Sequence, residues 1–334
     1  MDTGSVDATR EIAVAAGARL VDFPWQHDFA AARNEGLAHA HGAWILYIDA
    51  DERVRECDRA SLDARLDDPS LVACTVRFRP RSGYTRYREY RLFRSDPRIR
   101  FHGVIHETTL PAIQRVVAED GGRIGESDLA IDHVGYDGDL TAKHHRNLPL
   151  LQARLAAEPD HVYCWQQLGH TLLALGDEAG AVGAWHRGLE VIRRRPEPLA
   201  TDRSLYLDLL LHDARAGEGR TPLLVEALRH FPGDPLLAWL DGHALIGEER
   251  PAEAIPIFEG LRRIDADARC DDRVAYDARL FGAYADDALG LCYFRLGRFR
   301  DSARFYALAE AGDPANPAHR VKRLLAEARA RGAS

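Results

Sequence analysis

Two aspartates, Asp49 and Asp51, stand at the end of an apolar run over residues 43–49, which is the pattern of a buried parallel strand. In an open α/β sheet, ligands bind beyond the carboxyl ends of the strands. Carboxylates at positions i and i+2 of such a turn can both face one cleft, and their hard oxygens suit Mg²⁺ or Mn²⁺ bridging a diphosphate. The alternative is that the two acids only solvate a turn.

Two further segments are candidates for binding an anion. Asp2-Thr3-Gly4-Ser5 is a turn before a helix expected over residues 7–16, and the N-terminus of a helix can bind a nucleotide. Alternatively, Ser5 only caps that helix. Arg33, in a helix expected over residues 28–40, can pair with phosphate through its planar guanidinium, or it lies on a helix surface.

The elements that must position these residues alternate between helix and strand before residue 140. Further strands are expected over residues 19–23, 71–79 and 90–94. This order predicts an α/β domain with a mostly parallel sheet. The segment 83–87 between two of the strands reads equally well as an acceptor loop or as a hairpin turn.

After residue 140 the strands stop, and a helical repeat takes over. Trp165, Leu168 and Gly169, followed by Ala181 and Trp185, fit a tetratricopeptide-like hairpin. The set Leu289, Gly290, Tyr293, Gly297, Tyr306, Ala309 and Pro314 fits it again, with weaker copies around Gly242–Phe258 and over residues 205–231. Since one hairpin cannot bury its own apolar face, several hairpins must stack.

These motifs resemble the inverting family 2 glycosyltransferases of the GT-A fold, most closely the bacterial subgroup with tetratricopeptide repeats after the catalytic domain. The resemblance is carried by the Asp-Thr-Gly-Ser turn, by the Ala-Arg-Asn motif at 32–34 and by the strand ending in Asp-Ala-Asp-Glu at 49–52. It continues through segments 90–94, 100–107, 133–136 and 143–151.

The resemblance implies a role for each matching residue. Asp2 falls where such enzymes contact the base of the donor nucleotide, and Arg33 and Asn34 fall on the motif lining the donor site. Asp49 and Asp51 fall on the acidic pair (the DxD motif) that holds the ribose and the divalent metal, Mn²⁺ or Mg²⁺. With Ser5, these residues form the expected site for a nucleotide-diphospho-sugar, and Asp51 is the better metal ligand.

The pair His106-Glu107 falls near the acceptor. An inverting transfer needs a base for the proton of the attacking group, and Glu107 suits that role. His106 is expected to be a third metal ligand or to orient Glu107. His133 competes as a ligand, although a hydrogen bond to the backbone is the favoured expectation for it. The adjacent pair His144-His145 is expected at a surface.

The start of the chain departs from the family pattern. A complete domain of this type begins with another strand and helix before the Asp-Thr-Gly-Ser turn, and here Met1 directly precedes that turn. The expected explanations are a start codon assigned too late, a gene cut short, or a degenerate paralogue. An exposed sheet edge is expected where the strand is missing.

Composition narrows the function classes. The 44 Lys+Arg against 52 Asp+Glu give a net charge of −8, which disfavours a general nucleic-acid binder. No apolar stretch is long enough to cross a membrane, no signal peptide is legible and the five cysteines are scattered, so a cytoplasmic location is expected. The predicted domains are a sheet domain over residues 1–140, a linker helix over 141–160 and repeats over 161–330.

The sequence therefore predicts metal-dependent, inverting transfer from a nucleotide-diphospho-sugar to an acceptor that is a glycan, a lipid-linked sugar or a polypeptide. The alternative is an inactive paralogue whose repeats bind a protein partner. A nucleotidyl or phosphoryl transferase is less favoured because no phosphate-binding loop with a lysine is present.

Overall fold

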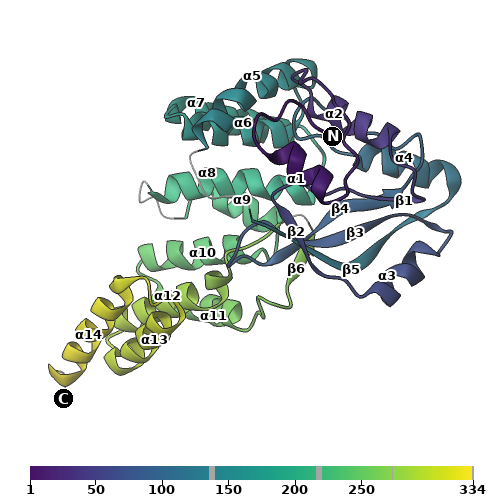
Figure 1. Ribbon diagram of the computed structural model, residues 1–334. Coiled ribbons are helices and arrows are strands. Elements are labelled where there is room, and N and C mark those ends of the chain that lie inside the picture. The colour runs from purple at the N-terminus through teal and green to yellow at the C-terminus, as the bar shows by residue number, and fades with distance from the viewer. Residues whose placement is uncertain (135–139, 216–219, 273, 333–334) are drawn as a thin grey trace. The chain divides into compact units, whose positions relative to one another are not determined.

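The computed structural model describes residues 1–134, 140–215, 220–272 and 274–332. An α/β part comes first in the chain and a run of helices follows (Figure 1). The chain divides into two compact units, residues 1–78 with 88–184, and residues 79–87 with 185–334. The first unit therefore extends past the predicted sheet domain and includes the first helices of the repeat region.

The first unit is built on a sheet with the strand order β1-β4-β3-β5-β2. The strands are β1 (Trp44–Leu46), β2 (Glu52–Glu56), β3 (Leu71–Arg79), β4 (Arg86–Arg94) and β5 (Arg123–His133). The sheet is mixed rather than mostly parallel, because β1 pairs with β4 and β2 with β5 in antiparallel register. The expected strand at 19–23 is only a parallel bridge between Asp2 and Asp22.

The apolar run before Asp49 is not the buried strand that we expected. Only Trp44–Leu46 is extended, at one end of the strand order, and the side chains of Leu46 and Ile48 are 39% and 46% exposed. The buried central strand is β3, whose first six residues are all buried, as its continuous apolar sequence predicts.

Helices cover this sheet: α1 (Thr9–Ala15), α2 (Phe29–Ala38), α3 (Arg59–Leu66) and α4 (Leu110–Asp120). The start of α2 is fixed by Asp28, whose carboxylate accepts from the Ala31 backbone N–H at 2.9 Å. Gly17 has a φ of 81° just after α1, as the predicted helix end requires. Ser5 does not cap α1, since its side chain bonds to Asp2 instead.

Three helices follow the sheet in the chain: α5 (Thr141–Ala157), α6 (Val162–Ala174) and α7 (Glu178–Arg193). The first two belong to the first unit, and α7 crosses its end at Ala184. Leu151 and Cys164, both fully buried, join one cluster with Ile105 of the sheet domain and the partly buried Phe29. The predicted linker helix and the first hairpin helix therefore share a hydrophobic core with the α/β part.

The second unit contains the remaining hairpins. Its α-helices are α8 (Arg203–Arg215), α9 (Pro222–His230), α10 (Pro235–Gly247), α11 (Pro251–Arg262), α12 (Ala283–Arg295), α13 (Phe299–Gly312) and α14 (Pro317–Gly332), with η1 (Ala200–Asp202), η2 (Ala278–Phe281) and the short strand β6 (Cys270–Asp272). The predicted glycine positions pack under aromatic rings, since a Cβ on Gly290 would lie 2.7 Å from the ring of Tyr306.

The segment 83–87 contains the end of the turn between β3 and β4 and the first two residues of β4, and it belongs to the second unit. The Thr85 backbone N–H donates to the Tyr276 carbonyl at 2.8 Å, and the Tyr276 N–H donates back to Thr85 Oγ1 at 2.9 Å. Tyr276 in turn donates its hydroxyl to Asp234 at 2.6 Å. The hairpin turn, one of the two expectations for this segment, is the one observed.

Candidate functional site

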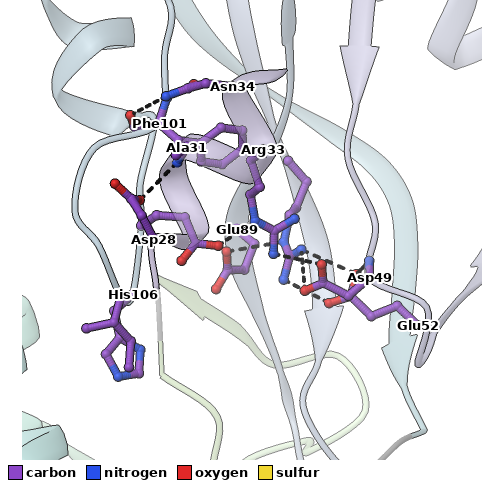
Figure 2. Close-up of polar contacts among 12 residues, drawn as sticks. Asp28, Ala31, Arg33, Asn34, Asp49, Glu52, Glu89, Phe101 and His106 are labelled. Carbon is purple, nitrogen blue, oxygen red and sulfur yellow. Dashed lines mark hydrogen bonds and ion pairs between the residues drawn. The ribbon is translucent and has the colours of Figure 1, made fainter. Parts of the chain in front are cut away.

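Arg33 on α2 joins two of the predicted site residues. Its Nη2 donates to Asp49 Oδ1 at 2.7 Å, and its Nε donates to the Glu107 carboxylate. The guanidinium lies over the adjacent rings of Tyr47 and Phe101, 5.2 and 5.5 Å from their centroids. Burial acts to lower the pKa of Arg33, but Asp49 and Glu107 raise it above its usual value. Arg33 thus joins Asp49, at the end of the apolar run, and Glu107, the predicted base, in one cluster. Figure 2 shows the pairing of Arg33 with Asp49.

Asn34, the next residue of the Ala-Arg-Asn motif, hydrogen-bonds to the protein backbone through its side-chain amide. Its Nδ2 donates to the Phe101 carbonyl at 3.0 Å, and its Oδ1 accepts from the Phe101 N–H at 2.8 Å (Figure 2). This two-way pairing fixes the chain where it enters the segment that carries Glu107. The predicted contact of Asn34 with the nucleotide-sugar stays a prediction.

The turn after Asp49 is closed by Glu52. The backbone N–H of Asp49 donates to Glu52 Oε2 at 2.7 Å, and the N–H of Glu52 donates to the Asp49 carbonyl at 3.0 Å. Glu52 is buried and bound by both terminal nitrogens of Arg91, at 2.9 and 3.3 Å. Burial raises the pKa of Glu52, and Arg91 opposes that shift.

Arg91 also lies 3.7 Å from Asp49 Oδ2 and 3.5 Å from Glu89 Oε2. Asp49 therefore contacts two arginines, Arg33 and Arg91. Glu52, Glu89 and Arg91 carry no role in the sequence prediction. Within the resemblance, Glu52 belongs to the Asp-Ala-Asp-Glu motif and Arg91 to the segment 90–94, but neither was given a function, and no motif included Glu89.

Asp51 contacts a different partner from Asp49. Its side chain is 48% exposed, and its Oδ2 lies 3.1 Å from His133 Nε2 on β5. His133, for which we favoured a hydrogen bond to the backbone, contacts the side chain of Asp51. Gly135 and Tyr136, the end of the same motif, lie outside the described residues.

Glu107 and His106 lie in a loop closed by paired backbone bonds between His102 and Thr108, of 3.0 and 3.1 Å. The Glu107 side chain is 10% exposed and bound to Arg33. Figure 2 shows the His106 ring away from Asp49 and Glu52. His106 packs against Tyr163 of α6, with ring centroids 5.2 Å apart.

The surroundings of His106 keep it neutral. Burial lowers its pKa to about 4, and the nearby positive charges of Arg154, His161 and Lys143 act in the same direction. Of the two histidines, His133 and not His106 contacts Asp51 of the acidic pair.

Asp2 and Ser5 form a closed turn. The Asp2 carboxylate accepts from the Ser5 hydroxyl at 2.6 Å, from the Ser5 N–H at 3.0 Å and from Arg10, which also binds Asp22. The bonds from Ser5 and then Arg10 hold the pKa of Asp2 well below its usual range. The turn is therefore preformed, and its contact with a nucleotide base stays a prediction.

The fit to a divalent metal rests on two donors. Within the described residues, no three His, Cys, Asp or Glu side chains lie together so as to hold a metal ion by themselves. Mg²⁺ is usually held by one or two carboxylates together with substrate phosphates. Asp51 with His133 therefore fits a cation whose remaining ligands come with a diphosphate.

Comparisons with known proteins find similarity to glycosyltransferases and to a repeat-containing protein. Residues 1–119 match the model of the family described as Glycosyl transferase family 2. A TPR repeat-containing protein of Synechococcus elongatus is 37% identical over 227 residues, covering 65% of this chain and 55% of that protein. The SPbeta prophage-derived glycosyltransferase SunS of Bacillus subtilis is 26% identical over 182 residues, covering 48% of this chain and 39% of that protein.

The chain thus spans about half the length, or less, of these curated relatives. Among solved structures, a chain of the APC/C hetero-tetramer Cut9–Hcn1 is similar with a TM-score of 0.44 and 15% identity, over 57% of this chain and 34% of that chain. YrrB, described as a TPR protein with an unusual peptide-binding site, has a TM-score of 0.39 and 14% identity, over 54% and 84% of the two chains.

No helix in the described part of the chain has the length and apolarity to span a bilayer. The family match covers the site residues from Asp2 to Glu107 but not His133, and the relative named for its repeats matches at higher identity than SunS. Residues 1–119 therefore resemble a family 2 glycosyltransferase domain, and a run of helices follows them in the chain.

Proposed function

We propose that the protein transfers a sugar from a nucleotide-diphospho-sugar to an acceptor in a single inverting displacement. The observation that carries the proposal is the cluster in which Arg33 binds both Asp49 and Glu107. It places a cation suited to a diphosphate beside a carboxylate suited to accept a proton.

In this proposal, Arg33 exchanges its carboxylate partners for the donor diphosphate. A planar guanidinium binds phosphate and carboxylate with the same two-pronged geometry, so the exchange needs only a side-chain movement. Once Arg33 has moved to the phosphate, the Glu107 carboxylate is released and can accept a proton. Donor binding would thus come before activation of the base.

The displacement itself forms one bond and breaks one. The acceptor X–H attacks the anomeric carbon of the sugar, and the bond between that carbon and the diphosphate oxygen breaks with its electron pair going to the diphosphate. The proton of X–H goes to Glu107. Attack opposite to the leaving group inverts the anomeric centre.

Asp51 and His133 would hold a divalent cation at this site, with Asp49 at its ribose side. When bound, such an ion neutralises charge on the departing diphosphate. Arg33 would add positive charge beside the diphosphate. The buried Glu52–Arg91 pair stabilises the conformation of the turn over residues 49–52.

The test is donor hydrolysis with Mn²⁺ and a panel of UDP- and GDP-sugars. Glu107→Gln should lower turnover by roughly 100-fold or more, since general base catalysis contributes about that much. The matched control is Glu126→Gln, whose side chain is 68% exposed on β5. Unchanged turnover in Glu107→Gln would remove this residue as the base.

A second function is favoured by the relative named for its TPR repeats. In that case the repeats bind a protein partner and the first unit is inert. Titration calorimetry of UDP with Mn²⁺ separates the two functions, because an inert domain gives no binding heat.

A further inference from the structure

We infer that Arg154 of α5 is a positioning residue that holds the loop carrying Glu107 in its working conformation. The inference rests on the proposed role of Glu107 and adds a residue from outside the matched family domain, which ends at residue 119. Arg154 touches no predicted substrate group, so it acts only through the loop.

The contacts of Arg154 are to the backbone that leads into Glu107. Its Nη1 donates to the carbonyl of Ile105 and, at 3.0 Å, to that of His106. Its Nη2 lies 3.0 Å from His161 Nε2, and because arginine only donates, Nε2 accepts. The side chain is 5% exposed, so these are buried charge-assisted hydrogen bonds, which are stronger than neutral ones.

The loop is shaped to admit this side chain. Gly103 has a φ of 99°, and a Cβ at this position would overlap the guanidinium of Arg154. His106 has a φ of 50°, a left-handed conformation that costs a non-glycine residue free energy and persists only where neighbours enforce it. Arg154 binds the carbonyl of this same residue.

The helix that supplies Arg154 is itself anchored. Leu151, one turn before it, is fully buried and Leu155 is 6% exposed, both in the cluster shared with Ile105 and Phe29. The guanidinium therefore cannot follow the loop if the loop shifts. Without Arg154, two carbonyls beside Glu107 would lose their buried donor, and the left-handed residue before Glu107 would be free to relax.

The first test compares Arg154→Lys and Arg154→Ala with a matched control, Arg94→Ala. Arg94 also binds two backbone carbonyls of the first unit, those of Leu71 at 2.7 Å and Asp68 at 2.8 Å, but none in the loop that carries Glu107. A misplacement of a reacting group by about 1 Å can cost roughly 100-fold. We expect that fall in kcat of donor hydrolysis for Arg154→Ala, with the donor KM and the Kd for UDP unchanged, and no such fall for the control.

Chemical rescue separates positioning from general loss of structure. Guanidinium ions at millimolar concentration should restore activity to Arg154→Ala but not to Arg94→Ala, and sodium chloride at the same ionic strength should restore neither. Equal losses in kcat for Arg154→Ala and Arg94→Ala, or a loss seen only in KM, would overturn the inference.

A second measurement does not depend on any activity. Hydrogen exchange of the peptide spanning residues 101–109 should be about tenfold faster in Arg154→Lys, since one lost buried hydrogen bond corresponds to that change in local opening, while residues 71–79 stay unchanged. Unchanged exchange in the loop refutes the clamp. If the wild type hydrolyses no donor but loop exchange responds as expected, the proposed function fails and the clamp stands.

Discussion

The guanidinium of Arg33 binds two carboxylates, that of Asp49 through Nη2 at 2.7 Å and that of Glu107 through Nε. Both carboxylates come from loops at the ends of different elements, so one helix residue fixes their separation. The same arginine lies over Tyr47 and Phe101, which restrict where its side chain can go.

Replacing Arg33 should weaken both donor binding and turnover. In Arg33→Lys the charge stays but the two-pronged geometry is lost, and we expect kcat/KM for donor hydrolysis to fall roughly 100-fold, the effect typical of one preorganised donor. Arg59→Lys is the control, because Arg59 forms a comparable pair with Asp63 on an exposed helix surface. A fall of the same size in both variants would contradict a special role for Arg33.

Metal dependence should follow Asp51 and His133. Asp51→Asn and His133→Ala should each weaken Mn²⁺-dependent UDP binding by about tenfold or more, because each removes one of only two protein donors. Calorimetry with and without EDTA measures this. His106→Ala serves as the discriminating control, and a greater loss there than in His133→Ala would restore His106 as the ligand.

A methyl group on Gly290 should destabilise the repeats. The Cβ would lie 2.7 Å from the Tyr306 ring, so Gly290→Ala should lower the free energy of unfolding by about 1–3 kcal/mol. Gly260→Ala, in α11 with no atom within 4 Å of its Cβ, should instead be neutral or stabilising by up to about 1 kcal/mol. Denaturant unfolding of both variants checks the pair, and equal effects would be inconsistent with this packing.

The second unit should lose stability in acid through His243. Burial lowers its pKa to about 4, Asp287 opposes the shift and Lys322 adds to it, while the ring packs 4.1 Å from that of Trp239. An unfolded histidine titrates near about 6.5. Between these values only the unfolded chain binds the proton, so the free energy of unfolding falls as the pH falls from 6.5 to 4, by about 3 kcal/mol at most.

His243→Leu should remove that part of the acid sensitivity, and the exposed His145→Leu should leave it in place. Denaturant midpoints at pH 7 and pH 4.5 provide the measurement. A pH dependence of the same size in wild type and His243→Leu would show that other groups carry it.

Patterns that depend on burial and spacing could be read from the sequence. β3 has the predicted bounds, residues 71–79, and the glycine–aromatic pairs of the repeats pack as their spacing indicated. The prediction of a buried strand before Asp49 was wrong. The composition of this run is that of a buried strand, but Leu46 and Ile48 are exposed, at one end of the strand order.

The direction in which a loop residue points could not be read. His106 and Glu107 are neighbours in the sequence, yet Glu107 binds Arg33 while His106 packs on Tyr163. The spacing also gave no sign that Arg154, on the predicted linker helix, would reach the carbonyl of His106. Both outcomes depend on long-range packing rather than on any local pattern.

The shared core of Leu151, Cys164 and Ile105 has a consequence for how such a chain can change over evolutionary time. Recombination that replaced everything after residue 140 would remove the apolar side chains that pack on the α/β part. The helices that supply this cover, α5 and α6, are therefore inherited together with the α/β part.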